Sequence, residues 1–288
     1  MRIDLQLHST YSDGYLAPSE LVKFIAKQGI KVAALTDHNT ISGVNEFQMA
    51  CHKNKIKPII GLELYAKLNG EKFNLLWFNF NHNDPDLHSL LVESQIRRRR
   101  RARTILNKIK TKLGLHLNVD NTIDRYNHYV PINHLVDDIL KNPKDRAIIY
   151  RQIKSKEPRE HDVINEIFQN REYGVLKESY IRIDRILKVR EKIGGQLILN
   201  HPGKYGHIKE SFLEKLKTIG FDGIETLSPH HSIGAIMYIQ QLARRFDFIE
   251  TGGSDFHRFE GGKGLLQSYA DYFCIDSKNL RSIKKIIK

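Results

Sequence analysis

The residues best suited to chemistry are short clusters of histidines and carboxylates, distributed along the whole chain. Imidazole and carboxylate groups are the ligands that bind borderline divalent ions such as Zn²⁺, Mn²⁺ and Fe²⁺. A carboxylate such as Glu63 can bridge two ions, which then lie roughly 3.5–4 Å apart. A lone histidine at a strand end is more often a hydrogen-bonded structural residue, but five clusters in one chain favour a metal site. They are His8 with Asp13, Asp37-His38, Glu63, His201, and Asp255-Phe256-His257.

The elements that must position these clusters are short strands alternating with helices. Residues 3–8 alternate apolar and polar side chains, which predicts a strand with Gln6 and His8 on the same face. The following stretches predict a helix from Pro18, a strand at 32–35, a helix near 44–54 and strands at 59–64 and 73–80. Further strands are predicted at 197–203, 221–227 and 246–257. This order is typical of parallel α/β units, whose active sites lie where the C-terminal ends of the strands converge.

The pattern changes in the middle of the chain. From residue 85 to residue 180, apolar residues recur at helical spacing, strands are scarce, and the charge is dense, with five consecutive arginines at 97–101. We predict a mostly helical insertion subdomain at 85–180. The segments 1–84 and 181–288 then form the domain that carries the metal-binding clusters.

Composition bounds the range of partners. The chain has 288 residues and a net charge of +13, which favours an anionic partner such as nucleic acid or a phosphorylated small molecule, although it also fits a merely soluble protein. The two cysteines form no CxxC pair, and no run of 18 apolar residues occurs. We therefore expect a cytoplasmic protein with no membrane association, and no protein partner is evident.

Five motifs together resemble the polymerase and histidinol phosphatase (PHP) family. They are LHSTYSDG (7–14), LTDHNTISG (35–43), GLE (61–63), NHPGKY (200–205) and GSDFH (253–257). Their order and the long insertion resemble the subgroup that acts on nucleoside 3′,5′-bisphosphates and on RNA 5′ ends. The resemblance implies a distorted seven-stranded (β/α) barrel with a helical insertion. It also implies two or three divalent metal ions as cofactors, expected to be Mn²⁺, Fe²⁺ or Zn²⁺.

The resemblance also implies a ligand set. One ion would take His8, Glu63 and Asp255, with Gln6 at a position where the family has histidine. A second ion would take Glu63 and His201, with Asn74 replacing another family histidine. The third would take Asp13, His38 and His257. Asp37 would orient its neighbours rather than bind an ion. Amide oxygens are weaker zinc ligands than imidazole, so we expect the second ion to be the weakest and the preference to tilt toward Mn²⁺.

Substrate phosphate requires cations besides the metal ions. Arg98 and Arg101 lie three residues apart on a predicted helix and so share one face, and guanidinium groups match phosphate geometry. His134 resembles a histidine at the start of an insertion helix in the subgroup, and Lys204 lies beside the His201 turn. A solvated helical face remains an equally good interpretation of the arginine run.

These observations predict a metal-dependent hydrolase of phosphate esters, which acts through metal-activated water on 3′,5′-nucleoside bisphosphates or on the 5′ ends of short RNA. The catalytic residues would be the metal ligands themselves. Two alternatives stay open. One is a degenerate barrel that binds nucleotide or nucleic acid without hydrolysis, and the other is a phosphatase for a small molecule such as histidinol phosphate. Neither the substrate nor the oligomeric state follows from the sequence.

Overall fold

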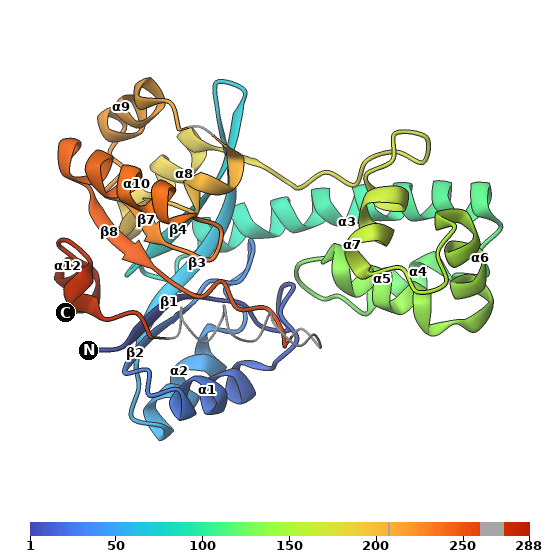
Figure 1. The fold of residues 1–288 in the computed structure, drawn as a ribbon, viewed down its shortest axis with the longest axis horizontal. Coiled ribbons are helices and arrows are strands. Elements are labelled where there is room, and N and C mark those ends of the chain that lie inside the picture. The colour runs from blue at the N-terminus through green and yellow to red at the C-terminus, as the bar shows by residue number, and fades with distance from the viewer. Residues whose placement is uncertain (207, 260–273) are drawn as a thin grey trace. The chain divides into compact units, whose positions relative to one another are not determined.

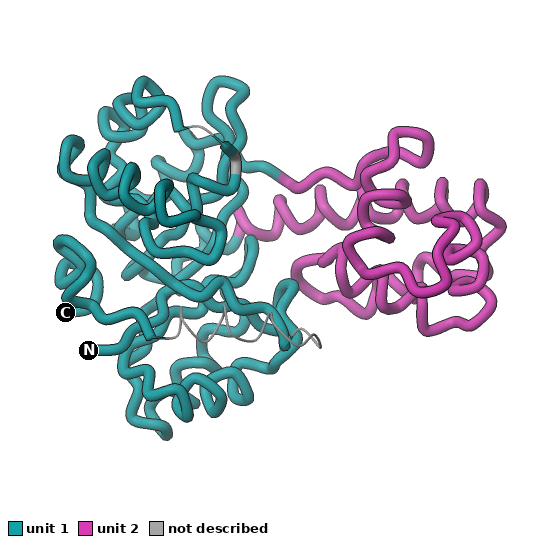
Figure 2. Tube along the Cα trace, viewed as in Figure 1, with its two compact units in different colours: residues 1–88, 180–288 teal, residues 89–179 magenta. Residues whose placement is uncertain are grey.

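The protein divides into two compact units. The computed structural model describes residues 1–206, 208–259 and 274–288. Unit 1 contains residues 1–88 and 180–288, and unit 2 contains residues 89–179 (Figure 2). Among the described residues, no helix combines the length and apolar character that crossing a membrane requires.

Unit 1 is organised around one mixed sheet (Figure 1). Its continuous path runs β1-β2-β3-β4-β6-β7-β8, and β5 pairs with β3 beside this path. The two ends of the path meet where the backbone N–H of His8 donates to the carbonyl of Phe256, which lies just beyond β8. The predicted α/β fold is confirmed, with seven strands on the continuous path and β5 as an eighth strand beside it. The strands are β1 Ile3–Leu7, β2 Val32–Leu35, β3 Lys57–Leu68, β4 Glu71–Phe78, β5 Ile181–Arg182, β6 Gln196–Leu199, β7 Gly223–Leu227 and β8 Ile249–Gly252.

One strand departs from the parallel pattern that the sequence predicts. β4 is antiparallel to both β3 and β6. The cause is the tight turn at Asn69 and Gly70, where both residues have positive φ values of 50° and 89°. An Asn-Gly pair with two positive φ angles closes a two-residue hairpin, so the chain reverses instead of crossing over through a helix. β4 is accordingly paired with β3 along its full length, from Glu71 opposite Leu68 to Phe78 opposite Gly61.

Helices pack around these strands. Apolar side chains of α1 and α2 form one core with the outer faces of β1 and β2. A second core gathers strand side chains with the C-terminal helix α12. Helix α1 begins at Pro18, which needs no hydrogen-bonded N–H there, and the Glu20 side chain accepts from the backbone N–H of Ala17. The helices of unit 1 are α1 Pro18–Lys27, α2 Val44–Lys53, α8 Ile183–Ile193, α9 Glu210–Thr218, α10 Ile233–Arg245 and α12 Lys284–Ile287, with short 3₁₀ turns η2 Pro202–Tyr205 and η3 Ser277–Asn279.

The described residues of unit 2 are helical, with a core of their own. The long helix α3 contains all five arginines of the run at 97–101. Ala102, Leu106 and Ile109 place a buried stripe on this helix at the spacing that the sequence predicts. The helices are α3 Pro85–Leu113, α4 Val119–Asp124, α5 Ile132–Lys141, α6 Pro143–Ile153 and α7 Glu160–Val163, followed by the π-helical turn η1 Ile164–Phe168.

Candidate metal centre

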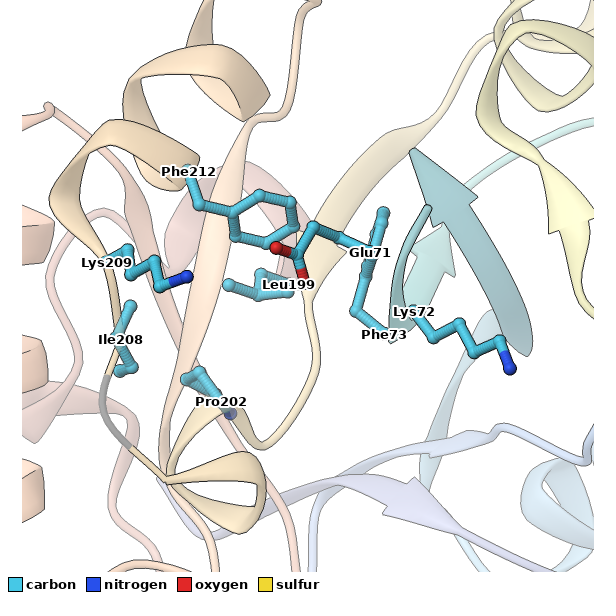
Figure 3. A pocket seen from close by; sticks show the side chains of 8 residues that line it. All are labelled: Glu71, Lys72, Phe73, Leu199, Pro202, Ile208, Lys209 and Phe212. Atoms are coloured by element: carbon cyan, nitrogen blue, oxygen red, sulfur yellow. The ribbon is translucent and has the colours of Figure 1, made fainter. Parts of the chain in front are cut away.

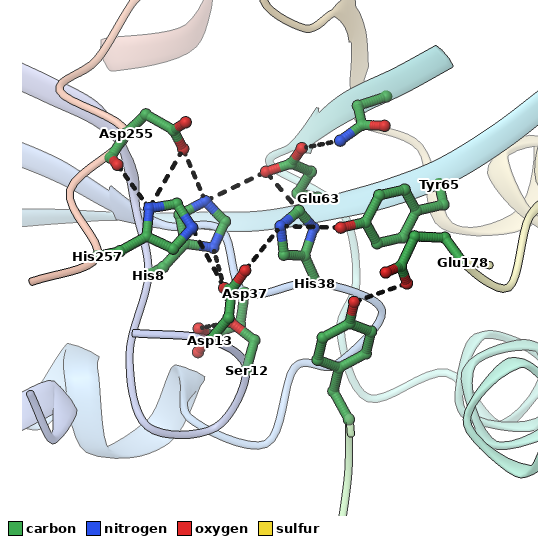
Figure 4. A network of polar contacts seen from close by, with 12 residues as sticks. His8, Ser12, Asp13, Asp37, His38, Glu63, Tyr65, Glu178, Asp255 and His257 are labelled. Carbon is green, nitrogen blue, oxygen red and sulfur yellow. Dashed lines mark hydrogen bonds and ion pairs between the residues drawn. The ribbon is translucent and has the colours of Figure 1, made fainter. Parts of the chain in front are cut away.

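His8 lies at the centre of a buried group of carboxylates, directly after β1. Its Nε2 atom lies 3.2 Å from Glu63 Oε2 and 3.1 Å from Asp255 Oδ1 (Figure 4). The Nδ1 atom on the other side of the ring lies 3.5 Å from Asp13 Oδ1. His8, Glu63 and Asp255 each offer one ligand atom, and these atoms lie within 4.8 Å of one another. This spacing is compatible with a shared cation.

The Asp13 carboxylate lies among three imidazole rings. Besides His8, it faces His38 Nε2 at 3.4 Å and His257 Nε2 at 3.3 Å. The rings of His8 and His257 stack with their centroids 4.2 Å apart. The ligand atoms of all four residues lie within 4.8 Å of one another. We call this group, His8, Asp13, His38 and His257, the histidine cluster.

The other carboxylate oxygen of Glu63, Oε1, contacts one imidazole and one amide. Glu63 Oε1 lies 3.4 Å from His201 Nε2 and accepts a 2.6 Å hydrogen bond from the Asn74 amide nitrogen. The Gln6 amide nitrogen donates to Glu63 Oε2 at 3.5 Å. The side-chain oxygens of Gln6 and Asn74 are buried and have no hydrogen-bond partner among the residues that the structure describes. We call His201 and Asn74, together with the Oε1 atom that they face, the amide side.

Strand geometry explains why these residues meet. Residues two apart on a strand share a face, so Glu63 and Tyr65 point the same way from β3, and Asn74 lies opposite Tyr65 on β4. His38 follows β2, and its backbone bridges to Glu63. The Tyr65 ring stacks on His38 with centroids 4.6 Å apart, and its hydroxyl lies 3.3 Å from His38 Nε2. The paired strands β3 and β4, together with the end of β2, therefore bring the two groups to one place.

Asp37 contacts the loop that carries Asp13. Its carboxylate accepts hydrogen bonds from the Ser9 N–H at 2.7 Å and from the Ser9 and Ser12 hydroxyls at 2.6 Å each. Gly14 closes this loop, and a Cβ atom at Gly14 would lie only 2.3 Å from the His8 carbonyl oxygen. The loop therefore turns back tightly on His8, and Asp37 holds it there.

Two site residues have unusual backbones. His201 and Asp255 have φ values of 23° and 50°. A non-glycine residue in this region is strained by roughly 1–3 kcal/mol and persists only where the surroundings hold it. Such strain is concentrated at functional sites, which fits the location of both residues beside Glu63 or His8.

The electrostatics of the group favour positive charge at its centre. Burial lowers the pKa of His8, but the hydrogen bonds that its ring donates to Asp255 and Glu63 outweigh burial and raise this pKa well above its usual value. Burial tends to raise the pKa values of Glu63 and Asp255, yet the neighbouring imidazoles hold both well below their usual range. Burial lowers the pKa of His38 to about 4. The carboxylates thus remain ionised and attract a cation, as a metal site requires.

The predicted substrate-binding residues differ in the unit to which they belong and in how exposed their side chains are. Lys204 is exposed on η2, directly after His201. Arg101 and His134 belong to unit 2. Arg101 is exposed and donates to the Glu178 carbonyl, and the His134 ring lies 6.3 Å from that of Tyr126.

Arg98 requires a correction. Its side chain is fully buried in unit 2, where it donates to the carbonyls of Val130 and Lys177 at 3.0 Å and lies 3.0 Å from Glu178 Oε1. A guanidinium held this way stabilises unit 2 rather than facing solvent as a phosphate ligand. Arg98 and Arg101 do not form the shared phosphate-binding face that their spacing predicts.

His230 was missed by sequence reasoning, because it belongs to none of the five clusters described above. Its Nε2 atom lies 2.6 Å from Asp255 Oδ2, on the side of the carboxylate away from His8. His230 lies three residues after the end of β7, as His38 lies three after β2 and Asp255 three after β8. This shared offset from the strand ends was the available signal.

A separate pocket of about 250 Å³ lies near the amide side (Figure 3). Phe73 lines it and points to the opposite face of β4 from Asn74, and Pro202 directly follows His201. Its walls are largely apolar, so it is distinct in character from the metal centre. The lining residues are Glu71, Lys72, Phe73, Leu199, Pro202, Ile208, Lys209 and Phe212.

Comparisons with known proteins agree with this geometry. A 5′-3′ exoribonuclease of Haemophilus influenzae is 28% identical over 260 residues, 89% of this chain and 90% of the relative. A 3′,5′-nucleoside bisphosphate phosphatase of Chromobacterium violaceum is 24% identical over 91% of this chain and 90% of its own length. A solved structure from Bifidobacterium adolescentis matches 96% of this chain and 98% of its own with a TM-score of 0.76 and 19% identity, which shows a common fold. The PHP domain model matches residues 4–273, and the chain therefore belongs to the PHP family.

Proposed function

We propose that this protein is a metal-dependent phosphoesterase that hydrolyses phosphate esters of nucleotides, either 3′,5′-nucleoside bisphosphates or the 5′ ends of short RNA. The observation that carries the proposal is the convergence of the histidine cluster and the amide side on Glu63. Residues that are separated by up to 249 positions (His8 to His257) lie close enough to share cations.

The donor set fits divalent ions. Buried, unpartnered oxygens on Gln6 and Asn74 and ionised carboxylates beside imidazoles form a mixed oxygen and nitrogen environment. Two or three ions, Mn²⁺, Fe²⁺ or Zn²⁺, would supply activated water and neutralise phosphate charge. The residues proposed to hold them are Gln6, His8, Asp13, His38, Glu63, Asn74, His201, Asp255 and His257.

The chain's own residues prepare this site in three ways. Asp37 fixes the loop that carries Asp13. Tyr65 packs against the His38 ring and limits its rotation. The exposed Lys204 beside His201 is proposed to attract the substrate phosphate. Asp37 and Tyr65 thus hold the ligand atoms in place before substrate binds.

The proposed substrate class rests on two supports. The relatives named above are an exoribonuclease and a nucleoside bisphosphate phosphatase, and they match the chain over most of its length. The net charge of +13 also favours anionic substrates larger than one phosphate. A third relative, a phosphoribosyl 1,2-cyclic phosphate 1,2-diphosphodiesterase of Eggerthella lenta, is 24% identical over 88% of this chain and 93% of its own length, so a small-molecule ester belongs in the test.

The degenerate alternative also has a specific observation in its favour. The Asn74 amide nitrogen, which cannot bind a metal ion, is the group that faces Glu63 Oε1. Amide nitrogen and oxygen are assigned from hydrogen bonding, so rotation by half a turn would present the unpartnered oxygen instead. Metal binding therefore requires this rotation if Asn74 is to act as a ligand.

The test combines metal analysis with turnover. Purified protein is loaded with Mn²⁺, and hydrolysis of a nucleoside 3′,5′-bisphosphate, a 5′-phosphorylated oligoribonucleotide and histidinol phosphate is compared. We expect bound metal and turnover of one of the first two, with loss of turnover on chelation. Preferred hydrolysis of histidinol phosphate would favour the small-molecule alternative. Absence of both bound metal and turnover would establish the degenerate barrel.

A further inference from the structure

The arginine run on α3 is divided between two kinds of surroundings. Arg98 pairs with Glu178 at 3.0 Å, Arg99 with Asp124 at 3.3 Å, and Arg97 with Glu93 at 3.6 Å. Arg103, one turn further on, pairs with Asp120 at 2.8 Å. In contrast, Arg100 and Arg101 are exposed and form no ion pair with any described residue. The run is therefore not one uniform charged face.

The two unpaired arginines border a groove of about 700 Å³ within unit 2. Arg100 and Thr104 are four residues apart on α3, as are Arg101 and Ile105, so the four side chains lie in two neighbouring rows. The remaining lining residues, Arg171, Val175 and Lys177, come from the segment after η1. Among the described residues, the lining thus contains four cations and no acidic residue.

Gly174 explains how that segment reaches α3. It has a φ of 96°, and a Cβ atom there would lie 2.7 Å from the Ile105 side chain. Only glycine allows the backbone to pass this close to α3 in that conformation. Arg171 and Lys177 flank this contact, and neither forms an ion pair with a described residue. The fold therefore places four uncompensated positive charges around one apolar floor.

Uncompensated charges at this density repel one another, so a partner with several negative charges would stabilise the arrangement. Guanidinium groups bind phosphate through paired donors, and their planes stack on bases. The volume exceeds the space that one phosphate requires, and the apolar floor of Ile105 and Val175 suits bases better than inorganic ions. An acidic peptide would satisfy the charge but makes less use of this floor.

We propose that the groove lined by Arg100, Arg101, Arg171 and Lys177 binds the phosphodiester backbone of single-stranded RNA. The proposal rests on the proposed function, since it identifies the substrate as an oligonucleotide rather than a mononucleotide. All four of these cations belong to unit 2, and none of them is among the residues proposed to hold the metal ions.

Binding is measured separately from hydrolysis, by fluorescence anisotropy of a labelled oligouridylate in the presence of EDTA. The groove variant Arg100→Gln/Arg171→Gln/Lys177→Gln is compared with a matched variant, Arg103→Gln/Lys112→Gln/Arg159→Gln. The matched variant loses the same three charges from unit 2, but each of its residues is ion-paired. All six positions are exposed or half-buried, and thermal melting checks that both variants fold.

We expect the groove variant to bind oligouridylate at least about tenfold more weakly than the matched variant. A plot of log K for oligouridylate binding against log salt concentration should have a slope that is smaller in magnitude by about 2 for the groove variant. Each of the three lost phosphate contacts removes roughly 0.7 from this slope. Equal weakening in both variants would show that only net charge matters and would overturn the proposal. Competition by polyglutamate as effective as that by RNA would overturn it in favour of an acidic protein partner.

The outcome is independent of whether the metal centre is active. Hydrolysis of a nucleoside 3′,5′-bisphosphate by the unaltered protein in Mn²⁺ tests the proposed function alone. If hydrolysis occurs and the groove variant binds RNA normally, the groove proposal fails and the proposed function stands. If hydrolysis is absent but the groove variant binds RNA weakly, the groove binds RNA without serving catalysis.

A single charge reversal, Arg171→Glu, should reproduce the weakening of RNA binding, and normal RNA binding by this variant would count against the groove.

Discussion

The two oxygens of Glu63 separate two chemically different halves of the centre. Oε2 faces His8 at 3.2 Å and His38 at 3.7 Å, whereas Oε1 faces His201 at 3.4 Å and the Asn74 amide at 2.6 Å. The histidine cluster includes Asp13, His38 and His257, the full set that the family resemblance implies for the third ion, although the Gln6 amide lies beside Oε2 where the family has histidine. The amide side keeps one imidazole and replaces another with an amide. The same bridging carboxylate thus connects a strong donor set to a weak one.

The comparison shows what each half contributes. A neutral imidazole nitrogen binds a metal ion directly, whereas an amide nitrogen only donates a hydrogen bond and its oxygen is a weaker ligand. We therefore expect the histidine cluster to retain its ion under conditions that empty the amide side. Graded chelation should remove ions in two steps, and the predictions below alter one half or the other.

The largest effect is expected from Asp255→Asn. Asp255 places Oδ1 3.1 Å from His8 Nε2, and its pKa lies well below the usual range, so it provides a full negative charge at the centre. Loss of this charge should reduce kcat by more than the roughly 10–100-fold typical of residues that only orient ligands. The measurement is Mn²⁺-dependent hydrolysis together with metal content. Thermal melting and circular dichroism should change little, and retained turnover would remove Asp255 from the site.

A smaller effect is expected at His230, which holds the other oxygen of Asp255. His230→Ala should lower metal affinity or kcat by about 10–100-fold, since groups that orient a ligand typically have effects of this size. His230→Gln keeps a donor nitrogen at a similar reach and should restore most of the loss. Equal losses in both variants would mean that His230 does more than orient Asp255. Unchanged metal affinity and kcat in both would show that the 2.6 Å contact has no functional weight.

The sequence allowed more of this centre to be anticipated than of unit 2. His8, Asp13, His38 and His257 follow strand ends, and the alternation that defines a strand also fixes where such residues point. The antiparallel β4 was missed because its signal, Asn69-Gly70, lies between two apolar runs that read equally well as parallel strands. The Asn-Gly turn determines that β4 runs antiparallel to β3, and the pattern of apolar residues alone does not reveal this direction.

Long-range pairing explains the error at Arg98. Helical spacing correctly places Arg98 and Arg101 on neighbouring turns of α3. Their environments, however, depend on the 171–179 segment, which brings Glu178 and two carbonyls to Arg98 and leaves Arg101 at the edge of the groove. Nothing local to residues 97–101 encodes this difference. Partner assignment for charged residues therefore required the tertiary structure.

A gain is expected on the amide side from Asn74→His. Among the described residues, His201 is the one imidazole paired with Oε1, so a second imidazole there adds a strong ligand. Metal affinity at the weak step should rise by up to about tenfold, the lower range of effects seen for residues around metal ligands. Zn²⁺ retention should increase relative to Mn²⁺, measured by mass spectrometry of dialysed protein. Asn279→His, on the exposed η3 turn, is the control for adding a histidine elsewhere.

Gln6→His is the comparator that tests the asymmetry itself. Gln6 lies 3.5 Å from Oε2, the oxygen that already has His8 and His38 nearby, so a third imidazole there has less to add. The crowded backbone reinforces this, because a Cβ atom at Gly253 would lie 2.4 Å from the Gln6 nitrogen. The gain in metal affinity should be smaller than that of Asn74→His. If Gln6→His gives the larger gain, the histidine cluster is the deficient half, and the division at Glu63 must be reversed.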